Sequence, residues 1–293
     1  PLRRLSRTIP HGTRNRSLLE QCCNKNIPIA RAVWFARCVG ANELRGLKRK
    51  GSTQVGSVTE VQWIFEWTEQ VTEFIEKVIK ECPEESSATS ASANIAAAAS
   101  SNNPMKPAPK PFGSASSAST KSTLSNSQPW KVKMEYITRL AANLFSEGLL
   151  DKPLFLKWCI VNLQKCRIEE LPVAILFIRL FWDGIVQSRL LSQNLALALL
   201  ERFSELSSPT FSKYQVFVTF KEKVSEALFN FFIFSPDSFV IPQYWKKLGP
   251  VLIEALKGIN DEVAQQVLEL VCMRNESFSV TDVKFHKILG QKL

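Results

Sequence analysis

Apolar residues recur along most of this chain at spacings of three and four positions, the period of an α-helix with one buried face. The pattern is clearest over residues 57–82. The positions expected to be buried there are Val61, Ile64, Phe65, Thr68, Val71, Thr72, Ile75, Val78 and Ile79. The same spacing predicts helices over residues 16–24, 27–42, 57–82, 130–147, 151–166, 170–187, 190–206, 219–234, 237–258, 261–274 and 281–289. Only residues 215–220 alternate as a short strand would.

Local signals define several ends of these helices. Residues 57–60 (SVTE) form a capping box, and Pro28 suits the first turn of the helix over 27–42. Gly148 is a typical C-terminal cap, and Asp151 with Pro153 predicts a new N-terminus directly afterwards. Short connections favour antiparallel neighbours, so we expect an all-α fold, an irregular helical-repeat-like array of antiparallel helices.

Composition divides the chain into three parts. Residues 83–129 are dominated by Ser and Ala, include four prolines between 104 and 111, and are almost uncharged from Ser86 to Gln128. Such a tract buries too little apolar surface to offset its ordering entropy, which predicts a disordered linker. We therefore expect a basic helical region over 1–82, the linker over 83–129, and a helical array domain over 130–293.

The net charge of +10 lies at one end of the chain. Residues 1–50 contain twelve Lys and Arg but only Glu20 and Glu43 as acids, and the two signs balance over the rest. Such a segment is attracted to an acidic protein surface or to phosphate, although it could also be a solvated arm. Residues 47–51 (LKRKG) resemble a short nuclear-localisation signal.

Motifs for catalysis or metal binding are missing from the sequence. The two histidines, His11 and His286, are far apart, no cysteine pair has zinc-ligand spacing, and there is no phosphate-binding glycine loop. Seven cysteines in a long chain without a leader argue against a disulfide framework. Cys159 and Cys166 are expected to be small buried residues. The sequence predicts no enzyme, no cofactor and no membrane span, and Pro1 suggests a fragment or a processed chain.

Two groups of segments carry a family resemblance. Residues 9–12 (IPHG), 18–22 (LLEQC) and 26–38 (NIPIARAVWFARC) resemble the N-terminal signature of the Mediator subunit 12 family, and residues 42–51 (NELRGLKRKG) resemble its continuation in fungal members. Further matching pieces are residues 65–70 (FEWTEQ), Trp130, residues 147–151 (EGLLD), Trp158 and residues 187–191 (QSRLL). The resemblance covers residues 9–80 and 130–206.

The resemblance implies a nuclear, non-catalytic scaffold of the Mediator kinase module that regulates transcription by RNA polymerase II. Its expected partners are cyclin C, the module's cyclin-dependent kinase and the module's largest subunit. The segment credited with kinase activation in this family is not recognisable in this sequence. Pro28, Trp34, Trp67 and Trp158 are expected to build the helical core.

We expect the basic segment to be the contact surface, because opposed charge accelerates and orients docking. The partner-binding residues we predict are Arg31, Arg37, Arg45, Lys48, Arg49 and Lys50. The alternative function is a basic nucleic-acid-binding helical module, although aromatic residues accompany the charges only at Trp34 and Phe35. An enzyme with an unfamiliar site is a third hypothesis, supported only by scattered acids.

Overall fold

The computed structural model describes residues 15–49, 56–82, 124–209, 211, 215–257 and 262–289. In these residues the chain forms eleven α-helices, two short 3-10 helices and no strand, which confirms the all-α prediction. The first four are α2 (Asn15–Asn24), α3 (Ile29–Arg49), α4 (Gly56–Lys80) and α6 (Leu124–Ser146). The others are α7 (Lys152–Lys165), η1 (Ile168–Glu170), α8 (Leu171–Leu180), α9 (Trp182–Val186), α10 (Arg189–Leu206), α11 (Gln215–Phe234), η2 (Pro236–Phe239), α12 (Pro242–Leu256) and α13 (Glu262–Leu289).

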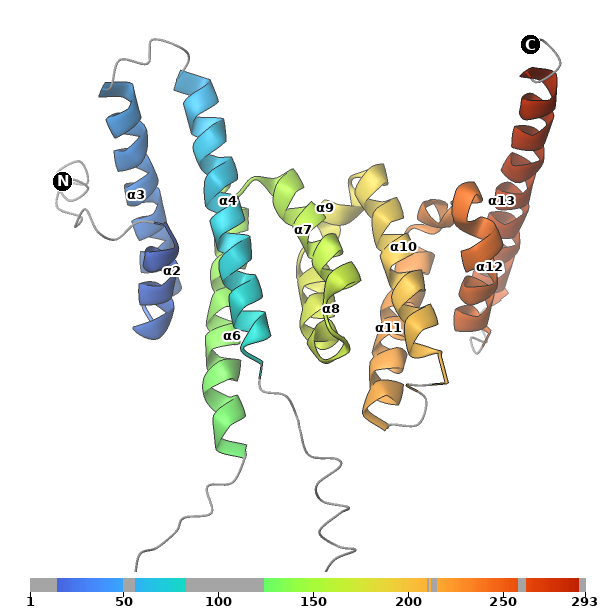
Figure 1. Ribbon diagram of the computed structural model, residues 1–293, viewed down its shortest axis with the longest axis horizontal. Helices are drawn as coiled ribbons and strands as arrows, with labels where there is room; N and C mark the ends of the chain where they lie inside the picture. Colours follow the sequence, from blue (N-terminus) through green and yellow to red (C-terminus); the bar gives the residue numbers. More distant parts are fainter. Residues whose placement is uncertain are drawn as a thin grey trace, which may run out of the picture.

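The helices stand side by side in a row, with α2 and α3 at one end and α13 at the other (Figure 1). Each packs mainly on its near neighbours: α3 and α4 on α6, α7 on α8 and α10, α10 on α11, and α12 on α13. One continuous cluster of buried apolar side chains runs from Leu18 in α2 to Val271 in α13. Nearest-neighbour packing of this kind is typical of a helical array.

Helices from both sides of residues 83–123 pack against each other. The indole N–H of Trp130 in α6 donates to the Val78 carbonyl of α4 at 2.7 Å, and Thr68 Oγ1 accepts from the Asp151 N–H at 2.8 Å. The start of α6 thus lies beside the end of α4, and the turn after α6 lies beside the middle of α4, so the two helices run antiparallel. Residues 83–123, which hold most of the predicted linker, lie outside the described residues. The division of the chain into 1–82, 83–129 and 130–293 stays a prediction.

The turn between α6 and α7 follows the local signals in the sequence. Gly148 has φ of 66°, in the left-handed region that favours glycine, so it ends α6 as predicted. Asp151 is the N-cap of α7, since its Oδ1 accepts from the Leu154 N–H at 2.9 Å, and Pro153 lies in the first turn. Both end predictions are confirmed.

Several element predictions were wrong. The single helix expected over 170–187 is divided into η1, α8 and α9. Residues 215–220 belong to α11, because Phe217 and Phe220 continue the helical spacing of the buried Val224, Ala227 and Phe231. The helix expected from Trp130 begins at Leu124, inside the predicted linker. The helices expected over 261–274 and 281–289 are one helix, in which Ser277 Oγ donates to the Arg274 carbonyl one turn earlier instead of capping a new helix.

The apolar stripe of α4 is buried only along its second half. From Trp67 onward the predicted positions are buried, with Ile75 and Val78 fully inaccessible. Val61 and Phe65 are 63% and 38% exposed, so the prediction that they are buried was wrong. The reason is visible in Figure 1, where the first half of α4 extends beyond the packed row together with the end of α3. The predicted helical period was right, but how much of the apolar stripe is buried depends on where the neighbouring helices end.

Candidate protein-interaction surface

Five of the six predicted partner-binding residues lie on α3, the helix near one end of the array. They are Arg31, Arg37, Arg45, Lys48 and Arg49, and Lys50 lies outside the described residues. We call all six the basic surface. Arg31 and Arg37 are exposed to solvent, and the side chains at 45–49 lie outside the description. The structure thus places five of these residues on helix α3, and what they bind stays a prediction.

Arg37 forms an ion pair that sequence reasoning missed. Its guanidinium contacts the Glu147 carboxylate at the end of α6, and both side chains are about half exposed, at 51% and 48%. An exposed pair of this kind contributes about 0–1 kcal/mol to folding, because water already solvates both groups well. An acidic group of a partner could therefore replace Glu147 beside Arg37 with little loss of folding free energy. In the free chain the ion pair orients the Arg37 side chain.

A second charged surface runs along the far half of α4. An open depression of about 500 Å³ is lined by Glu73, Glu76, Lys77, Lys80 and Glu81. The amines of Lys77 and Lys80 pair with Glu20 and Glu76 at 2.9 and 3.7 Å, and Lys133 of α6 pairs with Glu81 at 2.6 Å. Because acids and bases alternate and pair, this depression has no strong preference for a ligand of either sign.

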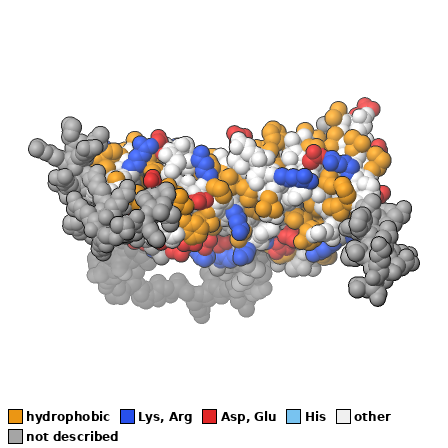
Figure 2. Space-filling model, turned by 90° about the horizontal axis from the view of Figure 1, so that it is seen from above, with side chains coloured by type: hydrophobic (Ala, Val, Ile, Leu, Met, Phe, Trp, Pro, Cys, Tyr) orange, Lys and Arg blue, Asp and Glu red, His pale blue; other side chains and the backbone are white. Residues whose placement is uncertain are grey.

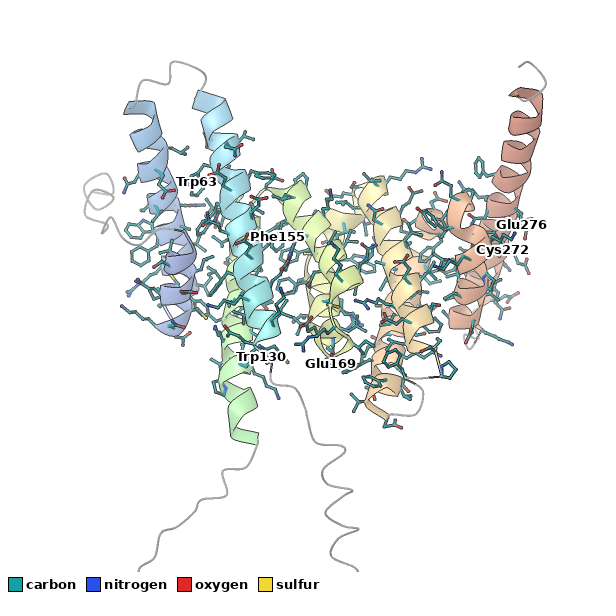
Figure 3. The ribbon with its side chains drawn as sticks, in the orientation of Figure 1. Trp63, Trp130, Phe155, Glu169, Cys272 and Glu276 are labelled. Carbon is teal, nitrogen blue, oxygen red and sulfur yellow. The ribbon has the colours of Figure 1, made fainter. Side chains whose placement is uncertain are left out.

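The tryptophans serve mainly to join helices. Trp63 stacks on Trp67 with ring centres 5.9 Å apart and donates to Glu43 of α3 at 2.7 Å (Figure 3). Trp158 of α7 packs on the core and donates to Glu76 of α4 at 2.8 Å. Trp67 is buried, so the core role predicted for Trp67 is confirmed, and Trp158 fits it from a half-buried position.

The predicted core role was wrong for one residue and only partly right for another. Pro28 is exposed, and its contribution is its carbonyl, which accepts from the N–H groups of Arg31 and Ala32 at the start of α3. Trp34 is half-buried and contacts Phe35. The buried stripe of α3 consists instead of the smaller Ala32, Val33, Ala36, Cys38 and Val39.

Five of the seven cysteines are buried, and Cys82 and Cys272 are partly buried. Cys159 and Cys166 are 0% and 7% exposed, which confirms the prediction. Burial raises the pKa of the Cys22 and Cys166 thiols to about 11, so both stay protonated and weakly nucleophilic at neutral pH. Within the ranges that the structure describes, no three His, Cys, Asp or Glu side chains gather as metal ligands would, and no helix combines the length and the apolarity needed to cross a membrane.

Two buried polar side chains hold connections between helices, and the helical pattern gave no signal for either. Arg202 of α10 donates to the carbonyls of Leu163 and Cys166, where α7 ends. Asn275 of α13 is fully buried, accepts from the Ile241 N–H at 2.7 Å and donates to the Phe239 carbonyl at 3.0 Å. Both satisfy backbone groups that burial would otherwise leave unpaired.

Comparison with known proteins indicates one family. The model of the family described as "Transcription mediator complex subunit Med12" matches residues 1–37. Proteins named Mediator of RNA polymerase II transcription subunit 12 are similar over nearly the whole chain. Those of Neurospora crassa and Aspergillus terreus are each 32% identical over 278 residues, or 94% of this chain, and that of Coccidioides immitis is 36% identical over 249 residues, or 84%. The chain spans only 13–14% of the length of these relatives.

Proposed function

Because this chain is a homologue of part of the fungal Mediator subunit 12 proteins across 94% of its own length, we propose that it is a non-catalytic scaffold of the Mediator kinase module. In this role it acts in the nucleus and regulates transcription by RNA polymerase II. It holds the cyclin-dependent kinase and cyclin C and joins them to the module's largest subunit. The observation that carries the proposal is the length of the match, which spans helices on both sides of residues 83–123.

The architecture suits this role. A row of helices that contact mainly their neighbours exposes a long surface for its size, and such arrays commonly bind other proteins. This support is an analogy at the level of the fold, so the family match remains the stronger argument.

We assign the contact with the module to the basic surface on α3. It lies in the segment that carries the whole net charge of the chain, and the described part of α3 keeps Arg31 and Arg37 at the surface. The expected counterpart is an acidic surface of a module protein, since opposed charges accelerate encounter and select the orientation.

Binding assays at two salt concentrations test the assignment. The chain is immobilised and offered purified cyclin C, the kinase and the largest subunit separately, at ~0.15 M and ~0.5 M salt. Replacing Lys48, Arg49 and Lys50 together by Glu should weaken capture at the lower salt by at least about tenfold. The matched control reverses three exposed lysines at the other end of the array, Lys246, Lys247 and Lys257, and should bind as the unmodified chain does.

The possible results of these assays test the assignment of the basic surface and the scaffold role separately. Equal binding by both triple variants would reject the basic surface but leave the scaffold role. Failure of the unmodified chain to bind any of the three proteins would contradict the scaffold role itself. If the chain instead bound DNA or RNA at ~0.15 M salt with a steep fall at higher salt, the nucleic-acid alternative would replace it.

A further inference from the structure

Helix α3 presents a stripe of residues at one end of the row of helices. Ala30, Trp34, Arg37 and Ala41 follow one another at intervals of four, three and four residues, which place side chains on one face of a helix. Ala30, Arg37 and Ala41 are exposed, and Trp34 is half-buried. In Figure 2, Lys and Arg side chains lie among apolar ones at the end of the molecule where α3 stands. We call these four residues the α3 stripe.

The side chains in and beside the α3 stripe are suited to binding a protein. Trp34 lies three residues from Arg31 and three from Arg37, a spacing that makes side chains neighbours on a helix surface. The Trp34 indole rests on the Phe35 ring with ring centres 5.3 Å apart, which orients it before any partner arrives. Tryptophan and arginine carry much of the binding energy at protein interfaces. The side chain of Arg31 has no acidic partner among the residues that the structure describes.

A carboxylate of the chain itself already occupies one end of this surface. Glu147 follows the last residue of α6, and its N–H donates to the Asn143 carbonyl at 3.0 Å, so the position of its backbone is fixed. From there its carboxylate pairs with the Arg37 guanidinium, although both side chains are about half exposed. The ion pair shows that a carboxylate fits against Arg37 from outside α3, and its exposure means that another carboxylate can displace it with little loss of stability.

We propose that the α3 stripe docks an acidic amphipathic helix of a module protein, and that Glu147 competes with this helix for Arg37. The small side chains of Ala30 and Ala41 let a second helix approach closely on either side of the indole. The stripe spans about three turns, roughly 16 Å, so the docked helix lies lengthwise. Its apolar residues cover Trp34, and its carboxylates pair with Arg31 and Arg37.

Docking then exchanges one ion pair for another. Glu147 leaves Arg37 when the carboxylate of the partner arrives, so the internal pair lowers the affinity for every partner and discriminates against those that lack an acid at this position. The identity of the partner as a module protein rests on the proposed function, whereas its acidic helical character follows from the spacing and charge of the stripe.

Calorimetric titration of the 293-residue chain with cyclin C, the kinase and the largest subunit, each separately at ~0.15 M salt, tests the proposal. Trp34→Ala and Arg37→Gln should each weaken binding by at least about tenfold, because both remove an anchor of the interface. Glu147→Gln should strengthen binding by about two- to fivefold, because Arg37 is then free of its internal partner. In the Arg37→Gln chain, Glu147→Gln should lose most of this effect.

The matched control is Glu226→Gln. Glu226 of α11 pairs with Arg179 of α8 at 3.0 Å, and these side chains are 45% and 44% exposed, so the control removes one acid from an exposed ion pair between two helices far from α3. It should bind as the unmodified chain does. All variants should keep the unfolding temperature within a few degrees, and Glu147→Gln tests the competition at an exposed position even if Trp34→Ala destabilises the fold.

Hydrogen exchange of the bound module protein identifies what covers the stripe. Slowing should be confined to a helix rich in Asp and Glu, and the slowing should be lost with Trp34→Ala. Protection of a basic or uncharged segment instead would overturn the proposal. A dimer of the 293-residue chain in sedimentation that Trp34→Ala dissociates would also overturn it, since a second copy would then cover the stripe.

The titrations distinguish this inference from the proposed function. If the unmodified chain binds a module protein but Trp34→Ala and Arg37→Gln bind equally well, the stripe is not the docking surface and the scaffold role stands. If Glu147→Gln binds no more tightly than the unmodified chain or than Glu226→Gln, the internal competition is refuted. Absence of binding by the unmodified chain to all three proteins would contradict the scaffold role and the assignment of the partner together.

Discussion

At the scale of single residues, the folded array depends on a few buried polar groups. The Arg202 side chain is 8% exposed, and its guanidinium contacts the end of α7, where helix carbonyls have no intrahelical donors. Its Nε–H donates to the Leu163 carbonyl at 2.7 Å, and its Nη1 pairs with Glu205 at 2.5 Å. A positive group at a helix C-terminus also interacts favourably with the helix dipole. In the sequence Arg202 is one of four charged residues of α10, and its carbonyl partners 36 to 39 residues away become visible only in the fold.

Substituting this arginine should therefore be costly. Arg202→Met keeps most of the side-chain volume but leaves the carbonyls of Leu163 and Cys166 unpaired, so we expect the free energy of unfolding to fall by about 2–4 kcal/mol. Urea denaturation followed by circular dichroism measures it. Arg189→Met, at the exposed start of the same helix, should change stability by less than about 0.5 kcal/mol. Similar losses in both variants would mean that Arg202 contributes no more than a surface charge.

At the scale of elements, close approach of α3 and α4 depends on a glycine. A methyl group at Gly40 would lie 2.6 Å from the ring of Trp63, nearer than atoms can pack. The indole has little room to retreat, since it stacks on Trp67 and is bonded to Glu43. Alanine would gain about 1 kcal/mol in helix propensity, but overpacking costs about 1–3 kcal/mol. The cost of the steric clash should therefore exceed the gain in helix propensity, so alanine at position 40 should destabilise the fold.

The expected result is that Gly40→Ala lowers the unfolding temperature and changes tryptophan fluorescence as Trp63 is displaced. Trp63→Leu in the same chain removes the ring and should reverse the effect of alanine at position 40, so that the two substitutions are strongly non-additive. Calorimetry of the two single variants and the double variant completes the cycle. Additive losses would contradict a direct contact between the two positions.

Element ends could be predicted where the signal is local. Asp151 and Gly148 cap helices through groups within three residues, so the sequence contains the whole interaction. The break predicted before Thr281 failed because a helix tolerates serine in its interior when the hydroxyl bonds back to a carbonyl, as that of Ser277 does. The strand predicted at 215–220 failed because six residues are too few to distinguish alternation from the start of a helical stripe.

At the scale of the whole molecule, the net charge of the chain is carried by residues 1–50, which include α2 and α3 at one end of the array. The sequence predicted the all-α class and the concentration of charge at the first end, because composition and period depend on no particular contact. It could not predict that Arg37 pairs with Glu147, 110 residues away, because this ion pair follows from how the helices pack against one another.

The most direct test of the central claim is reconstitution. The unmodified chain is mixed with the purified kinase and cyclin C, and then also with the module's largest subunit, and each mixture is separated by gel filtration at ~0.15 M salt. A scaffold should co-elute with the kinase and cyclin C and bring the largest subunit into the same peak, without catalysing a reaction itself. Elution of the chain alone from every mixture would contradict the claim.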